Sequence, residues 1–114
     1  MIQIYHNPRC GKSRSCLAFI EDTNQEYEII PYLTDTPSFE ELKKLLKELN
    51  IQPNELVRTK EKIWIENYKG KKLSDDQTIQ AMVDNPILIE RPIVVKDGKA
   101  IIGRDLDKVA SFLD

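Results

Sequence analysis

Several features of common protein classes are scarce in this sequence. Its 114 residues include two cysteines and one histidine, without metal-ligand spacing, so we expect no structural zinc site. The net charge of -2 lacks the positive excess that drives general nucleic-acid binding. No apolar run approaches the roughly 20 residues that span a bilayer. The sequence therefore predicts one globular domain, residues 1–114, with neither a nucleic-acid nor a membrane partner.

The N-terminal residues contain no basic segment followed by an apolar core, so we expect no signal peptide. Two cysteines are too few for a disulfide scaffold and fit a reducing compartment better. Together these observations predict a cytoplasmic protein.

Acidic residues are absent from the first twenty positions, where Cys10 stands in a polar segment rich in Gly and Pro. An apolar strand is predicted at 2–5 and a helix at 14–22, so Cys10 lies on a strand-to-helix turn. Unpaired backbone N–H groups and the helix dipole favour negative charge there. Three cationic side chains share this turn: Arg9, Lys12 and Arg14. We therefore predict a partly exposed Cys10 thiolate with a low pKa.

Both ends of the chain alternate between strand and helix patterns. Strands at 2–5 and 26–30 with a helix between them predict a parallel pair with a right-handed crossover. Further along, Asp97-Gly98 separates two β-rich runs, 92–95 and 100–102, which predicts a hairpin. A last helix follows Asp105, which can cap it.

The middle of the chain, about residues 36–85, predicts a helical insertion. Two capping boxes, Ser38 to Glu41 and Ser74 to Gln77, mark helix starts. The first helix carries an apolar stripe that we expect in the core: Phe39, Leu42, Leu45, Leu46 and Leu49. Shorter helices are expected at 54–57 and 60–68. The resulting order, βαβ, helices, ββα, predicts an α/β fold with a mixed four-stranded sheet.

Arginine is scarce too, with five arginines against twelve lysines. Two of the five, Arg9 and Arg14, flank Cys10, and the other three stand near predicted element boundaries: Arg58, Arg91 and Arg104. Lysine suffices for a solvated surface, whereas the planar guanidinium matches oxyanions. The distribution predicts that several arginines converge on one anion site.

The chain resembles the glutaredoxin-linked arsenate reductase (ArsC) family over essentially its whole length. The matching motifs are His6-Asn7-Pro8-x-Cys10-Gly11-x-Ser13-Arg14, Glu55-Leu56-Val57-Arg58, Asn85-Pro86-Ile87-Leu88-Ile89-Glu90-Arg91-Pro92 and Gly103-Arg104. The resemblance implies a thioredoxin-like (glutaredoxin-like) fold with a helical insertion.

The resemblance also implies roles. Cys10 matches the cysteine that attacks arsenate, and three arginines match those that hold the oxyanion: Arg58, Arg91 and Arg104. Supporting residues near the thiolate are His6, Ser13, Arg14 and Pro92, the last as a cis-proline. In the family, glutathione attacks the cysteine adduct as a co-substrate, glutaredoxin reduces the mixed species, and no cofactor is tightly bound.

Structural roles compete with some of these assignments. Ser13 can cap a helix, and His6 can serve as a structural hydrogen-bonding group. Arg58 can pair with Glu55 or Glu61 as an ordinary helix contact. The apolar face around Cys16 favours a packed core thiol over a resolving cysteine.

Two other functions fit the same residues. One is a glutathione-dependent thiol reductase of unknown substrate, in which the arginines hold glutathione carboxylates. The other is a redox regulator similar to Spx, which binds RNA polymerase. Such regulators commonly use Cys-x-x-Cys, and here Ser13 occupies the second position. The absence of that thiol favours an enzyme that uses an external one.

Overall fold

The computed structural model describes residues 1–114 and divides into two compact units. The first comprises Met1–Asp35 and Arg91–Asp114, and the second comprises Thr36–Glu90. The elements of the first unit are β1 (Ile2–Tyr5), α1 (Gly11–Asp22), β2 (Tyr27–Ile30), β3 (Ile93–Lys96), β4 (Lys99–Ile102) and α6 (Leu106–Leu113).

The first unit is built on a four-stranded mixed sheet in the order β2-β1-β3-β4. β1 pairs with β2 in parallel, while β3 is antiparallel to both β1 and β4. The predicted parallel pair and the predicted hairpin are therefore confirmed. At the hairpin turn, Asp97 and Gly98 both have positive φ, 53° and 76°. A tight turn between twisted strands requires this conformation, which Gly adopts without strain.

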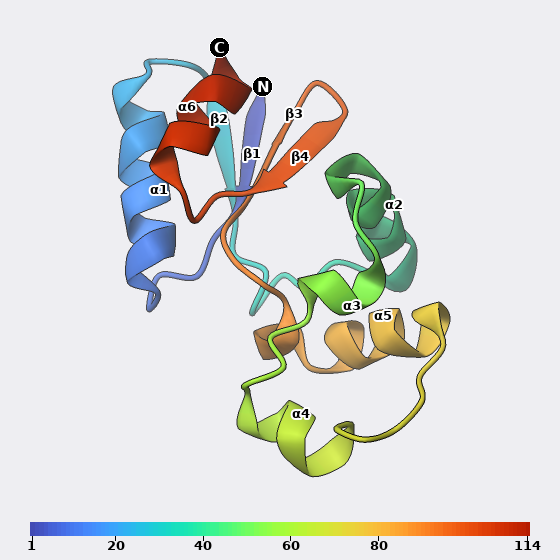
Figure 1. The fold of residues 1–114 in the computed structure, drawn as a ribbon. Helices are drawn as coiled ribbons and strands as arrows, with labels where there is room; N and C mark the ends of the chain where they lie inside the picture. The colour runs from blue at the N-terminus through green and yellow to red at the C-terminus, as the bar shows by residue number, and fades with distance from the viewer. The chain divides into compact units, whose positions relative to one another are not determined.

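Helices α1 and α6 cover one face of this sheet (Figure 1). Their inward side chains form the core with alternate residues of the strands: Ile2, Ile4, Cys16, Ile20, Val94, Val109 and Leu113. The Cys16 sulfur sits so close to Gly103 that a Cβ there would lie 2.9 Å from it. Burial raises the pKa of the Cys16 thiol to about 11. Cys16 is thus a packed core thiol, as predicted.

The second unit is helical. Its elements are α2 (Phe39–Leu49), α3 (Pro53–Leu56), α4 (Lys62–Asn67), α5 (Asp75–Asp84) and the 3₁₀ turn η1 (Pro86–Leu88). Both predicted capping boxes are formed, at Ser38 and at Ser74. An isolated bridge joins Val57 to Ile89 and connects the end of α3 to the segment after η1. Four members of the predicted apolar stripe of α2 are buried: Leu42, Leu45, Leu46 and Leu49.

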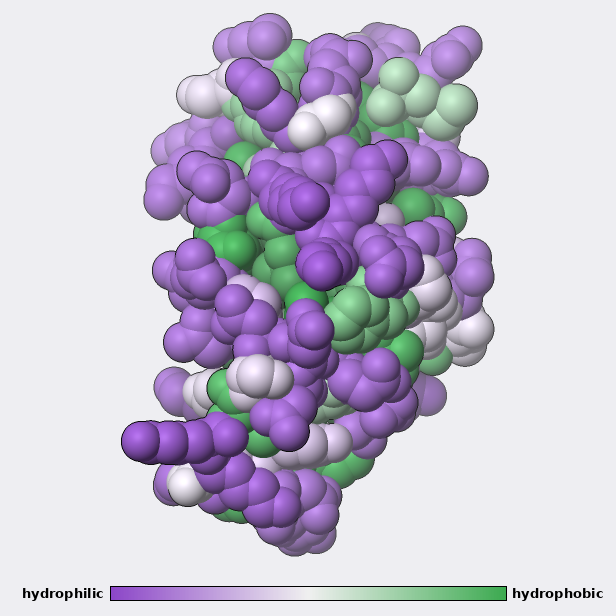
Figure 2. Space-filling model, turned by 90° about the vertical axis from the view of Figure 1, so that its right-hand side faces the viewer, coloured by the Kyte–Doolittle hydropathy of each residue, from purple (hydrophilic) through white to green (hydrophobic).

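On the face that Figure 2 shows, hydrophilic side chains predominate and hydrophobic side chains are visible between them. No helix combines the length and the hydrophobicity that crossing a bilayer requires. One boundary differs from the prediction in a way that concerns the site, because α1 begins at Gly11 rather than at residue 14. The first turn of α1 therefore includes the residues directly after Cys10.

Candidate active site

Cys10 lies at the N-cap of α1, directly after the turn that leaves β1. Its backbone is extended, with φ -99° and ψ 122°, and its side chain caps no helix N–H. The turn is closed by the Cys10 N–H, which donates to the Asn7 carbonyl at 3.1 Å, while the Arg14 N–H donates to the Cys10 carbonyl at 3.0 Å. The partly exposed sulfur is therefore free to face the N–H groups of the first helical turn.

The surroundings of Cys10 favour its thiolate. Partial burial opposes ionisation, but four groups outweigh it and lower the pKa of the thiol. In order of size they are the Ser13 backbone N–H, the charge of Arg91, the Lys12 backbone N–H and a hydrogen bond from Arg104. The predicted low pKa is confirmed in direction, and helix N–H groups and arginines both contribute to it.

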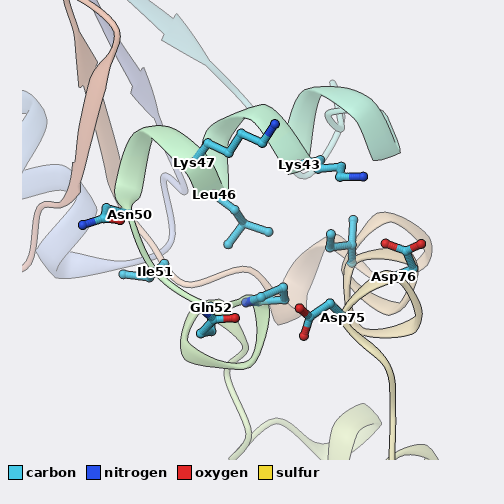
Figure 3. Close-up of a pocket in the computed structure, with 10 residues that line it drawn as sticks. Lys43, Leu46, Lys47, Asn50, Ile51, Gln52, Asp75 and Asp76 are labelled. Atoms are coloured by element: carbon cyan, nitrogen blue, oxygen red, sulfur yellow. The ribbon is translucent and has the colours of Figure 1, made fainter.

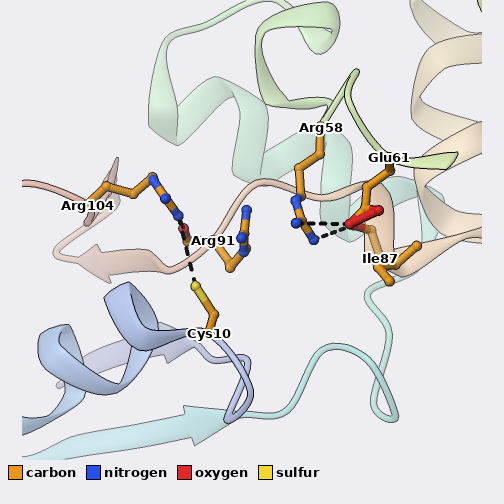
Figure 4. Close-up of polar contacts among 6 residues, drawn as sticks. All are labelled: Cys10, Arg58, Glu61, Ile87, Arg91 and Arg104. Atoms are coloured by element: carbon orange, nitrogen blue, oxygen red, sulfur yellow. Dashed lines mark hydrogen bonds and ion pairs between the residues drawn. The ribbon is translucent and has the colours of Figure 1, made fainter. Parts of the chain in front are cut away.

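Arg91 lies just before β3 and Arg104 just after β4, and both side chains lie beside Cys10 in the first unit (Figure 4). The Arg104 Nη1 lies 4.0 Å from the Cys10 Sγ and donates to the Arg91 carbonyl at 3.1 Å. Arg91 precedes Pro92 through a cis peptide bond, as the resemblance implied. Two of the three predicted arginines therefore share one unit with the thiolate and act on it, an arrangement suited to binding an oxyanion beside the sulfur.

A buried polar network links helix α1 to the turn between β1 and α1. Ser13 is fully buried, and its hydroxyl contacts His6 Nδ1 at 2.6 Å and accepts from the Asn7 N–H at 3.0 Å. Ser13 therefore does not cap α1, contrary to one of our alternatives, because its side chain points back to the end of β1. Burial, and then the charge of Arg14, lower the pKa of His6, so this imidazole is neutral at pH 7.

Asn7 and Arg14 hold the rest of the turn. The Asn7 Oδ1 accepts from the Arg9 N–H at 2.9 Å, and the Arg14 Nη1 donates to the Pro8 carbonyl at 2.9 Å. The role of Asn7 in this turn was not predicted from the sequence. The signal was available, because an Asn side chain that bonds to the backbone two residues on is a recurrent turn device. Arg14 thus braces the segment before Cys10.

Arg58 belongs to the second unit, at the end of α3. Its Nη2 pairs with Glu61 at 2.9 Å, and its Nη1 donates to the Ile87 carbonyl at 3.2 Å (Figure 4). The alternative pairing with Glu61 is thus present. The Arg58 backbone N–H also donates to the Leu88 carbonyl at 2.7 Å. Binding of the oxyanion by Arg58 stays a prediction.

Two cavities are relevant to the location of the site. The larger, about 450 Å³, lies within the second unit between Lys43 and Lys47 on one side and Asp75 and Asp76 on the other (Figure 3). It contains no nucleophile, and its charged side chains are solvent-exposed. The smaller, about 390 Å³, lies in the first unit and is lined by the residues that lead to Cys10. No cluster of three His, Cys, Asp or Glu side chains is placed to hold a metal.

The sheet order, the cysteine at the first strand-to-helix turn and the cis-proline define a thioredoxin-like protein with one partly exposed thiol. The sequence model of the ArsC family matches residues 5–112, and the chain therefore belongs to the ArsC family.

Relatives of full length agree with this assignment. The uncharacterized protein YfgD of Escherichia coli strain K12 is 46% identical, covering 98% of this chain and 96% of its own. An arsenate reductase of Neisseria meningitidis serogroup A is 36% identical, covering 98% and 97%. The solved structure of an arsenate reductase from Vibrio cholerae is 43% identical and superposes with a TM-score of 0.91, covering 96% and 95%.

Proposed function

We propose that this protein is an arsenate reductase in which Cys10 is the only catalytic thiol of the chain and external thiols supply the electrons. The observation that carries the proposal is the Cys10 sulfur itself, whose pKa is lowered by helix N–H groups and two arginines. Relatives named arsenate reductase that align over nearly the whole chain support the choice of oxyanion.

The chemistry balances with two external thiols. The Cys10 sulfur bonds to As(V) and one arsenate oxygen leaves as water. A first thiol replaces a second oxygen, which also leaves as water. A second thiol then attacks the sulfur of the first thiol and a disulfide forms. The bond between that sulfur and arsenic breaks, and its electron pair stays on arsenic, which becomes As(III). Water finally displaces arsenite and regenerates the Cys10 thiol. The net reaction consumes arsenate and two thiols and produces arsenite, one disulfide and one water.

The chain's own residues serve the first step. Arg91 and Arg104 balance charge on the arsenate oxygens as the sulfur attacks, without being deprotonated themselves. The N–H groups of Lys12 and Ser13 hold the sulfur as a thiolate. We assign Arg58 to the same anion on the strength of the family motif.

The reductant must come from outside. Ser13 replaces a second thiol in the motif and its hydroxyl is committed to His6, while Cys16 is fully buried. We therefore propose glutathione as the first thiol and glutaredoxin as the protein that completes the reduction. The same requirement separates this protein from a regulator that forms a disulfide within one Cys-x-x-Cys segment.

The test is arsenite formation with glutathione and glutaredoxin, for the wild type and Cys10→Ser, with sulfate replacing arsenate as the control. We expect arsenite from the wild type alone, and only when arsenate is present. Absence of arsenate reduction by the wild type with several glutaredoxins contradicts the proposal. Thiol-disulfide turnover without arsenate indicates a general thiol reductase instead.

A further inference from the structure

The 390 Å³ cavity of the first unit lies directly before the nucleophile in the chain. The β1–α1 turn forms one wall and the segment after β2 forms the other: His6, Asn7, Pro8, Arg9, Pro31, Leu33 and Thr34. Pro8, Pro31 and Leu33 make much of this lining apolar. Arg9, at the end of this lining, directly precedes Cys10 in the chain.

One buried side chain offers the cavity a hydrogen bond. His6 is 8% exposed, and the structure gives its ring a single partner, the Ser13 hydroxyl at Nδ1. The Ser13 hydroxyl accepts from the Asn7 N–H and can donate its own proton to Nδ1, which selects one of the two neutral tautomers of His6. The neutral ring then carries its proton on Nε2, which has no partner in the chain. In this tautomer His6 presents its Nε2–H to a ligand in the cavity.

The lining also determines the chemistry of that ligand. The His6 N–H and the exposed Arg9 guanidinium both suit a carboxylate oxygen, whereas the Thr34 hydroxyl donates to the Pro31 carbonyl at 3.2 Å. The apolar part of the wall suits carbon, which arsenate lacks. A small organic molecule with a carboxylate therefore fits the cavity better than the oxyanion does.

We propose that this cavity binds a carboxylate-bearing arm of the small peptide thiol that attacks the Cys10 adduct. The inference rests on the proposed function and extends it, because it gives the first external thiol a binding site within this chain. The carboxylate lies against His6 and Arg9, and the carbon chain lies along Pro8 and Leu33. The thiol is thereby held beside Cys10.

The test uses the full chain as the Cys10→Ser variant and S-methylglutathione, which binds without reacting. We expect amide NMR shifts on 6–9 and 31–34, and none there with the diethyl ester, which lacks both carboxylates. Arg9→Gln should weaken binding about three- to fivefold, as loss of one solvated charged contact does. Lys99→Gln, which removes an equal charge at the exposed start of β4 and outside the lining, should change affinity less than about twofold. Leu33→Trp fills the cavity and should abolish the shifts.

A kinetic arm separates this inference from the proposed function. In enzymes with Cys10 intact, Arg9→Gln should raise the KM for glutathione but not the KM for cysteamine, which has no carboxylate. Arsenate reduction with unchanged KM values, or shifts that occur equally with arsenate alone, overturns the cavity assignment and leaves the reductase intact. Loss of arsenate reduction in the wild type overturns the proposed function. If Leu33→Trp does not fold, Arg9→Gln decides the question.

Discussion

Ser13 is the residue whose replacement most sharply tests the network beneath Cys10. Its hydroxyl is fully buried and serves two partners, His6 Nδ1 at 2.6 Å and the Asn7 N–H at 3.0 Å. Ser13→Ala leaves both without that partner, and a buried polar group left unsatisfied costs about 1–3 kcal/mol. Water from the adjoining cavity can reach His6 and replace the hydroxyl as its partner. Alanine is also the better helix former, and this difference offsets about 0.5 kcal/mol of the loss. With one group, the Asn7 N–H, left unsatisfied, we expect a net loss of about 0.5–2.5 kcal/mol in the free energy of unfolding.

Urea denaturation at pH 7 measures this loss, and Ser15→Ala is the matched control. Ser15 lies in the same helix, but its side chain is exposed, so its replacement should change stability by less than about 0.5 kcal/mol. For a chain of this size the Ser13 variant should also unfold about 2–10 °C lower. Equal stabilities of Ser13→Ala and Ser15→Ala would refute the network.

Three further predictions concern charge. Arg104→Ala should raise the pKa of Cys10, seen as a higher midpoint in the pH dependence of iodoacetamide alkylation; an unchanged midpoint contradicts the 4.0 Å contact. Alkylation at pH 7 followed by peptide mass spectrometry should modify Cys10 and spare Cys16, because burial raises the pKa of the latter to about 11; equal modification contradicts the assigned core position. Since the folded pKa of His6 lies below its ordinary 6.5, the unfolded chain takes up the proton first, and stability should fall as pH drops from 6.5 toward the folded pKa. A His6→Gln variant should lose this pH dependence, and retention of it assigns the effect to other groups.

Local chemistry made much of the fold predictable. The capping boxes at Ser38 and Ser74 satisfy helix N–H groups with residues three apart, so they are visible in any short segment. Asp97-Gly98 specifies a turn by the same kind of local rule. By contrast, α1 has Cys10 at its N-cap, a residue that is not one of the usual capping residues, and no side chain makes a capping hydrogen bond there. Because Cys10 occupies the N-cap, the sequence lacks there the Ser, Thr, Asp or Asn that usually marks the start of a helix.

The residues of the site could be predicted from the sequence more readily than the contacts between them. Low pKa at Cys10 follows from its turn and from the cations near it in sequence, whereas the contact with Arg104 joins positions 94 residues apart. Ser13 was ambiguous because its two partners lie six and seven residues earlier, beyond the reach of capping rules. The contact of Arg58 was easier to predict, because its ion pair with Glu61 joins residues three apart in the sequence.

The central claim is that one thiol of this chain, Cys10, reduces arsenate with electrons from external thiols. The most direct measurement is arsenite and disulfide produced per minute by wild type, Cys10→Ser and Cys16→Ala, each checked for folding. We predict one disulfide for each arsenite in the wild type, none of either with Cys10→Ser, and retained turnover with Cys16→Ala. Loss of turnover in a folded Cys16→Ala variant, or arsenite formation without Cys10, would contradict the account.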